Sequence, residues 1–110
     1  MRILLDQGTP VAIGDWLPGH FIRTAHMQGW GTLTNGELLR VAEEASFDVL
    51  LTTDTNLPHQ QNLEGRRLAV VILSKNRWAL IRRKSNEIAA AVTSAKPGTY
   101  TVVEISEKSK

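Results

Sequence analysis

Two apolar runs that each end in a carboxylate decide the fold of this chain: ILLD at residues 3–6 and VLLTTD at residues 49–54. Continuous apolar runs of this length are typical of strands that are buried on both faces of a parallel sheet. Parallel strands place their carboxyl ends at one edge of the sheet, where open α/β folds keep their ligand sites. We therefore expect Asp6 and Asp54 to lie at a common edge.

Strand and helix patterns alternate outward from these two runs, which favours βαβ units around a parallel sheet. Strands are expected at residues 2–5, 20–24, 47–53, 68–73 and 100–105, and helices at 10–17, 35–45 and 78–94, with a short helix within 55–65. The first of these helices is expected to begin with Thr9 as its cap and Pro10 at its first helical position. The expected fold is a three-layer α/β/α domain, with a central and mainly parallel sheet of about four or five strands.

Length and composition set limits on the class of protein. A chain of 110 residues has room for one core, so we expect a single domain over residues 1–106 followed by a polar tail at 107–110. The absence of cysteine excludes disulfides, thiolate metal sites and cysteine nucleophiles. No apolar stretch approaches the roughly 20 residues that span a bilayer, and the first residues lack a signal-peptide core. A soluble, cytoplasmic protein without membrane contact is the expectation.

Charge is distributed unevenly along the chain. Residues 1–65 hold three basic and eight acidic residues, whereas residues 66–110 hold ten basic and three acidic ones. The densest group of cations contains no acid and consists of Arg66, Arg67, Lys75, Arg77, Arg82, Arg83 and Lys84. Such a group can attract the phosphates of a nucleic acid. Solvated loops and helix ends, or an acidic partner protein, explain the same charges equally well.

Three acids are candidates for a site, and each has a structural alternative. Asp6 can accept hydrogen bonds from the turn that follows its strand, and Asp54 can cap a helix that begins near Asn56. Thr34 and Glu37 match a capping box, in which the threonine caps the helix and the glutamate bonds back to the N–H of the cap. Taken one at a time, the three acids favour these structural roles.

Taken together, the same acids suit a hard cation. Mg²⁺ or Mn²⁺ prefers oxygen ligands, keeps several waters, and can activate a water for attack on a phosphodiester. The three histidines are too scattered for a zinc motif, although His59 follows Asp54 closely enough to lie near such a site. Trp30 is expected to anchor its loop or to stack on a base, and Trp16 and Trp78 are expected to be packing residues.

The order and spacing of several segments resemble a known family. These segments are MRILLD at residues 1–6, Gly29-Trp30, NGELL at 35–39, FDVLLTTD at 47–54, and Asn56-Leu57. They are similar to the short PIN-like proteins of prokaryotes from residue 1 to about Leu73. The resemblance implies an α/β fold with a central parallel sheet. It also implies a ribonuclease activity, because many PIN domains are Mg²⁺- or Mn²⁺-dependent ribonucleases. These ribonucleases include VapC-type toxins, which are inhibited by an antitoxin.

The resemblance assigns the family's metal-binding acids to Asp6, Glu37 and Asp54. The chain departs from the family by lacking a convincing fourth acid between Asp54 and Glu87, and by carrying Gln7 and Asn35 where many relatives have acids. The side chains expected around the metal ligands are Gln7, Asn35, Asn56 and Gln61.

The expected function is therefore an endoribonuclease that acts as the toxin of a type II toxin–antitoxin pair. Its expected partners are an RNA substrate and a cognate antitoxin protein, and the family also suggests a homodimer. The alternatives are a weakly active or inactive PIN-like module that binds nucleic acid or a partner protein, and a nuclease directed at DNA.

Overall fold

A computed structural model describes residues 1–106 of the protein. All neighbouring strands of its five-stranded sheet are parallel, in the order β2-β1-β3-β4-β5. The strands are β1 (Arg2–Leu5), β2 (Phe21–Thr24), β3 (Val49–Thr52), β4 (Ala69–Leu73) and β5 (Tyr100–Val103). The helices are the 3-10 segments η1 (Val11–Trp16) and η2 (Arg82–Lys84), and the α-helices α1 (Asn35–Glu44), α2 (Leu57–Gln60), α3 (Trp78–Ile81) and α4 (Ser85–Ser94). The predicted α/β class with a central parallel sheet is confirmed.

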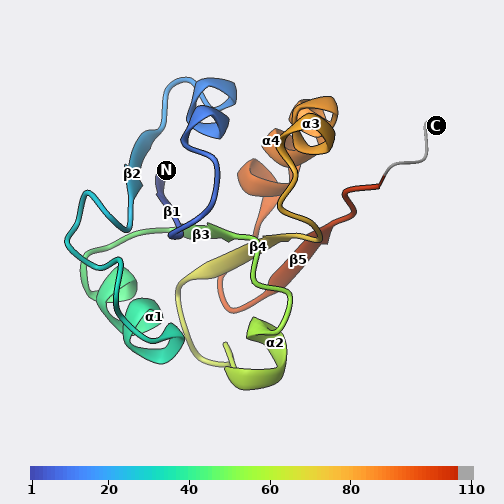
Figure 1. Ribbon diagram of the computed structural model, residues 1–110. Coiled ribbons are helices and arrows are strands. Elements are labelled where there is room, and N and C mark those ends of the chain that lie inside the picture. Colours follow the sequence, from blue (N-terminus) through green and yellow to red (C-terminus); the bar gives the residue numbers. More distant parts are fainter. Residues whose placement is uncertain (107–110) are drawn as a thin grey trace.

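Helices cover both faces of the sheet, as Figure 1 shows. The face beneath η1, α3 and α4 carries one apolar core, which includes Leu5 and Leu51. The opposite face, beneath α1 and α2, carries a second core that includes Leu4 and Leu50. Neighbouring residues of one strand thus enter different cores, because side chains alternate between the two faces of a sheet. This explains why the central strands are apolar at successive positions. Within residues 1–106, no helix is long and apolar enough to cross a membrane.

Two predicted helices differ from the expectation. The first is the short 3-10 segment η1, and Thr9 does not cap it, because the buried Thr9 hydroxyl donates instead to the Leu51 carbonyl at 3.4 Å. The helix predicted over 78–94 is divided into α3, η2 and α4. Lys84 departs from α-helical geometry, with φ −110° and ψ 23°, directly before Ser85. Serine favours helix starts over helix interiors, which fits a new helix beginning there.

The strand order contains one reversal of direction. After β1 the chain passes to β2 on one side of β1, and it later returns to place β3 on the other side. In open α/β sheets, ligands bind outside the carboxyl ends of the strands at such a switch point. The switch point here lies between β1 and β3, the two strands that are followed by Asp6 and Asp54.

Candidate functional site

The candidate site lies at the carboxyl ends of β1 and β3. Leu5 of β1 pairs with Leu51 of β3, and Asp6 then donates its backbone N–H to the Leu51 carbonyl at 2.9 Å. This pairing holds the first residue after β1 beside the end of β3. Asp54, two residues beyond the end of β3, lies on the same edge of the sheet.

A threonine hydroxyl joins the two acids. Thr52 is 1% exposed, and its Oγ1 donates to Asp6 Oδ2 at 2.7 Å. The same Oγ1 accepts the backbone N–H of Asp54 at 3.1 Å. A hydroxyl group has one donor and can accept in addition. Thr52 therefore fixes the Asp6 carboxylate relative to the backbone of Asp54.

Asp54 is held from two further directions. Its Oδ1 accepts the backbone N–H of Asn56 at 2.9 Å, which tightens the turn leading to α2. Its Oδ2 accepts from Asn35 Nδ2 at 2.9 Å, and this amide nitrogen also donates to Gln60 Oε1 at 3.0 Å. Asn35 thus connects the first turn of α1 with Asp54 and with the last residue of α2.

The other amide side chains predicted near the metal ligands lie around the same edge. Asp6 Oδ1 accepts the backbone N–H of Gln7 at 2.7 Å. The side chain of Gln7 lies against Gly31, where an added Cβ would approach Gln7 Oε1 to 2.8 Å. The side chain of Gln61 lies against Gly36 in the first turn of α1. Gln7 and Gln61 therefore pack against loop and helix backbone close to the acids.

Glu37 is engaged in the capping box that the sequence indicates. Its Oε1 accepts the backbone N–H of Thr34 at 3.0 Å and the Thr34 hydroxyl at 3.1 Å, while Thr34 Oγ1 accepts the N–H of Glu37 at 3.3 Å. These hydrogen bonds from Thr34 lower the pKa of Glu37 below its usual value. Glu37 as a third metal ligand stays a prediction, and to bind an ion its carboxylate would have to leave the cap.

The lowered pKa of Glu37 predicts a pH dependence of stability. A carboxyl whose pKa is depressed by folding stabilises the native state above its ordinary pKa, here 4.5, and loses this contribution as the pH falls through the lower folded value. We expect Glu37→Gln to reduce the free energy of unfolding more at pH 7 than in strong acid. Urea unfolding of both proteins across this pH range measures the difference, and a constant difference would contradict the prediction.

Asp6 and Asp54 are candidate cation ligands whose carboxylates are oriented by hydrogen bonds from Thr52 and Asn35. Each carboxylate oxygen of Asp6 and Asp54 accepts one hydrogen bond, and each has a second lone pair. Mg²⁺ commonly binds through one or two protein carboxylates, with waters and substrate phosphates completing its shell. Among residues 1–106, no group of three or more acidic, histidine or cysteine side chains is arranged for a metal. The structure therefore offers two oriented carboxylates at one edge of the sheet as candidate ligands, with amide side chains nearby.

The basic residues do not form one patch. Arg66 and Arg67 precede β4, at the amino edge of the sheet, where the backbone N–H of Arg67 donates to Glu43. Lys75 and Arg77 follow β4, at the carboxyl edge, and the remaining three cations form η2. Of these cations, only those that follow β4 therefore share the edge that carries Asp6 and Asp54.

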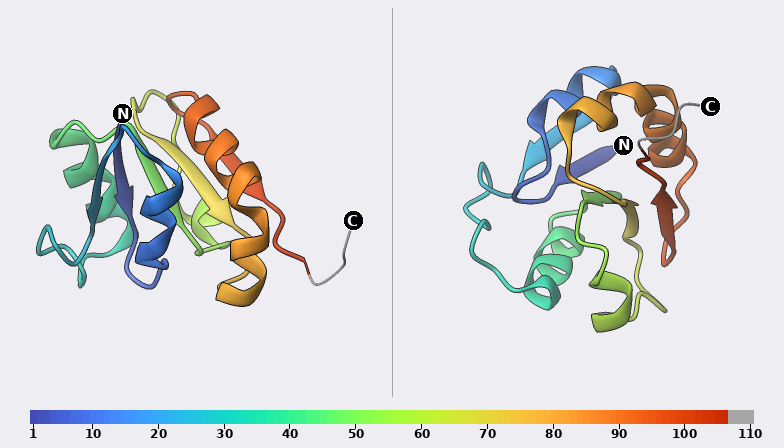
Figure 2. Two further views of the ribbon diagram at one scale, coloured as in Figure 1. Left: turned by 90° about the horizontal axis from the view of Figure 1, so that it is seen from above. Right: turned by 45° about the vertical axis from the view of Figure 1, so that its right-hand side comes forward.

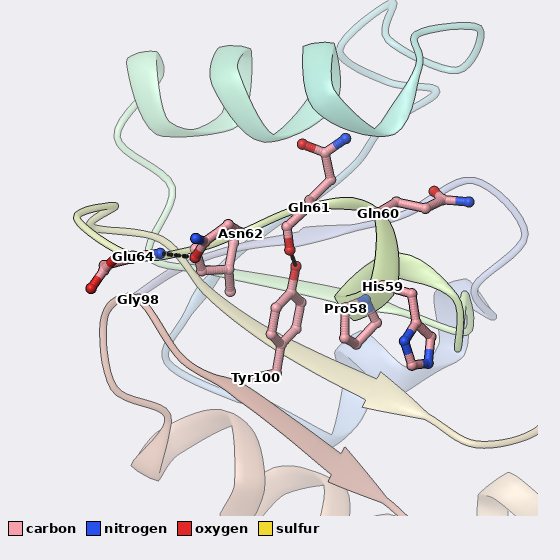
Figure 3. A pocket seen from close by; sticks show the side chains of 9 residues that line it. Pro58, His59, Gln60, Gln61, Asn62, Glu64, Gly98 and Tyr100 are labelled. Carbon is pink, nitrogen blue, oxygen red and sulfur yellow. Dashed lines mark hydrogen bonds between the residues drawn. The ribbon is translucent and has the colours of Figure 1, made fainter.

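A hollow in the surface lies beside α2 and the start of β5, with a volume of about 700 Å³ (Figure 3). Tyr100 closes one side, and its hydroxyl donates to the Gln61 carbonyl at 2.7 Å. Burial raises the pKa of Tyr100, and the charge of Arg66 partly offsets this. His59 lines the hollow, whereas Asp6, Glu37 and Asp54 do not. Gln60 connects the two places, because it lines the hollow and accepts from Asn35.

The chain was compared with protein-family models, with curated proteins and with solved structures, and none of them matched.

The geometry adds two residues that the sequence did not single out. Thr52 joins the acids, and Gln60 extends the network to α2. The hydroxyl of Thr52 at the end of an apolar strand was the available signal, but its partner became visible only when β1 and β3 were paired.

Proposed function

We propose that this protein is a Mg²⁺- or Mn²⁺-dependent endoribonuclease of PIN-like type that acts as the toxin of a toxin–antitoxin pair. Asp6 and Asp54 are its proposed metal ligands. The single observation that carries the enzymatic part is the Thr52 hydroxyl, which bonds to both aspartates at the switch point of the sheet. The antitoxin partner and the toxin role rest on the resemblance of residues 1–73 to PIN-like proteins.

The residues around the ion have separate tasks. A bound Mg²⁺ or Mn²⁺ supplies an activated water and neutralises charge on the leaving oxygen. Thr52 orients the carboxylate of Asp6, and Asn35 orients that of Asp54. Lys75 is exposed at the same edge and can attract the phosphate backbone.

Mn²⁺ is expected to stabilise the protein through this site. A ligand that binds only the native state at 100 times its Kd adds about 2.7 kcal/mol, which corresponds to a rise in Tm of roughly 10 °C or more in a domain of this size. Thermal melts with and without Mn²⁺ measure the rise. The rise should disappear in Asp6→Asn, and an equal rise in that variant would mean that the ion binds elsewhere.

A binding module without catalytic activity is the second candidate. It is favoured by the engagement of Glu37 in the capping box and by the bond from Asn56 to Asp54, because both give an acid a structural role. This candidate predicts no change in Tm with Mn²⁺ and no cleavage of RNA. The melting experiment therefore separates the two candidates before any substrate is known.

A further inference from the structure

Trp78 is a partly exposed aromatic residue near the carboxyl edge. It is the first residue of α3, and 42% of its surface is exposed. Its indole stacks on that of Trp16, with ring centroids 5.5 Å apart and planes inclined by 10°. The sequence suggested that both residues serve packing, and Trp16 does pack against the core. A large aromatic ring that is held by a stack and yet open to solvent has the form of a binding platform.

Cations flank this ring along the chain. Lys75 lies three residues before Trp78, and Arg82 lies four residues after it, which places Arg82 about one helical turn further along. Arg83 follows directly. All three side chains are exposed, and none forms an ion pair within the part of the chain that the structure describes. Lys84, by contrast, pairs with Glu87 at 3.5 Å.

The loop that precedes Trp78 is tied to the loop that follows Asp6. Asn76 Nδ2 donates to the Gly8 carbonyl at 3.0 Å. Gly8 lies two residues after Asp6, and Asn76 lies two residues before Trp78. Figure 2 (left) shows α3 beside the tip of the β4 arrow, at the end of the molecule where the parallel strands finish. The aromatic ring, the cations and the acids therefore belong to one edge of the sheet.

We propose that Trp78, Lys75 and Arg82 form a platform for single-stranded nucleic acid, with a base stacked on the indole and phosphates beside the cations. Exposed aromatic rings next to cations are how proteins bind single strands without sequence preference. Bases inside a duplex are already stacked on one another, so they cannot use the ring. The inference rests on the proposed function for nucleic acid as the ligand, and it narrows the substrate to unpaired strands.

The test is the binding of a fluorescein-labelled oligouridylate of about 12 nucleotides, a length typical of such sites, to the full chain in EDTA. Fluorescence anisotropy gives the Kd. We expect Trp78→Ala to weaken binding about 5- to 150-fold, the equivalent of one lost stacking contact, and Trp78→Phe to retain most of the affinity. Trp78→Leu keeps apolar bulk against Trp16 but lacks a π face, so it should bind as weakly as the alanine variant.

Salt dependence tests the cations separately. Loss of one phosphate contact by Arg82→Ala should reduce the slope of log K against log salt by about 0.7 for a single strand. The matched control is Arg40→Ala, because Arg40 is an exposed arginine on α1 that pairs with Glu44 on the opposite face of the sheet. Its slope and affinity should stay close to those of the unmodified protein.

Three outcomes would overturn the platform. Trp78→Ala could bind oligouridylate as tightly as the unmodified protein does, or the unmodified protein could bind an RNA hairpin of the same length as tightly as oligouridylate. Equal affinity of the unmodified protein for polyglutamate and oligouridylate would indicate an acidic protein as the partner. Binding and cleavage together distinguish this inference from the proposed function, because the platform predicts binding that depends on Trp78 and the nuclease predicts cleavage that Asp6→Asn lowers. Trp78-dependent binding without any cleavage would retain the platform and reject the nuclease. Cleavage with binding that is insensitive to Trp78 would do the reverse.

Discussion

Replacing Asp6 with Asn is expected to lower Mn²⁺-dependent cleavage of RNA at least about 100-fold while leaving the protein folded. A catalytic ion contributes several kcal/mol to transition-state stabilisation, and each 1.4 kcal/mol is a factor of ten in rate. The substitution removes one negative charge but keeps the shape of the side chain. An asparagine can still accept the N–H of Gln7, and its amide can donate to the second lone pair of Thr52 Oγ1.

The cleavage experiment uses structured and unstructured RNAs with Mn²⁺, and a matched control that changes another aspartate. Asp15→Asn makes the same chemical change at an exposed residue of η1 that takes no part in the hydrogen bonds of Asp6 and Asp54, and it should cleave at the rate of the unmodified protein. Cleavage that survives Asp6→Asn unchanged would reject Asp6 as a metal ligand. Cleavage of DNA at an equal rate would instead revise the substrate and leave the site in place.

Leu51→Ala is expected to reduce the free energy of unfolding by about 2–5 kcal/mol, the range for a buried leucine truncated in a core. Leu51 is 0% exposed on the middle strand β3, in the core beneath η1, α3 and α4. Small domains are stable by only about 5–15 kcal/mol, so the loss is a large share of the total.

Urea unfolding followed by circular dichroism measures the change, with Val11→Ala as the control. Val11 is an apolar residue that is 64% exposed at the start of η1, so its truncation should change the free energy of unfolding by about 0.5 kcal/mol or less. A loss below 1 kcal/mol for Leu51→Ala would mean that β3 is not the buried strand between β1 and β4.

Local patterns in the sequence predicted the elements well where the pattern involved near neighbours. The capping box of Thr34 and Glu37 forms as expected, because its partners are three residues apart. The helix predicted over 78–94 was wrong in its continuity, since its apolar stripe persists through the segment where α3, η2 and α4 change their hydrogen bonding. Apolar spacing indicates which side of a segment is buried, but it does not fix backbone geometry at each residue.

The sequence by itself determined that two apolar strands end near acids and that the sheet is parallel. The tertiary structure decided which groups meet. It set β1 beside β3, so that the Thr52 hydroxyl bonds to Asp6 and to the backbone of Asp54, and it separated Arg66 and Arg67 from the other cations by the length of β4. The physical reason is that strand order is set by burial across the whole sheet. Contacts between residues more than 40 positions apart, such as Thr52 and Asp6, follow from the strand order. The residues that neighbour Thr52 or Asp6 in the sequence do not encode that order.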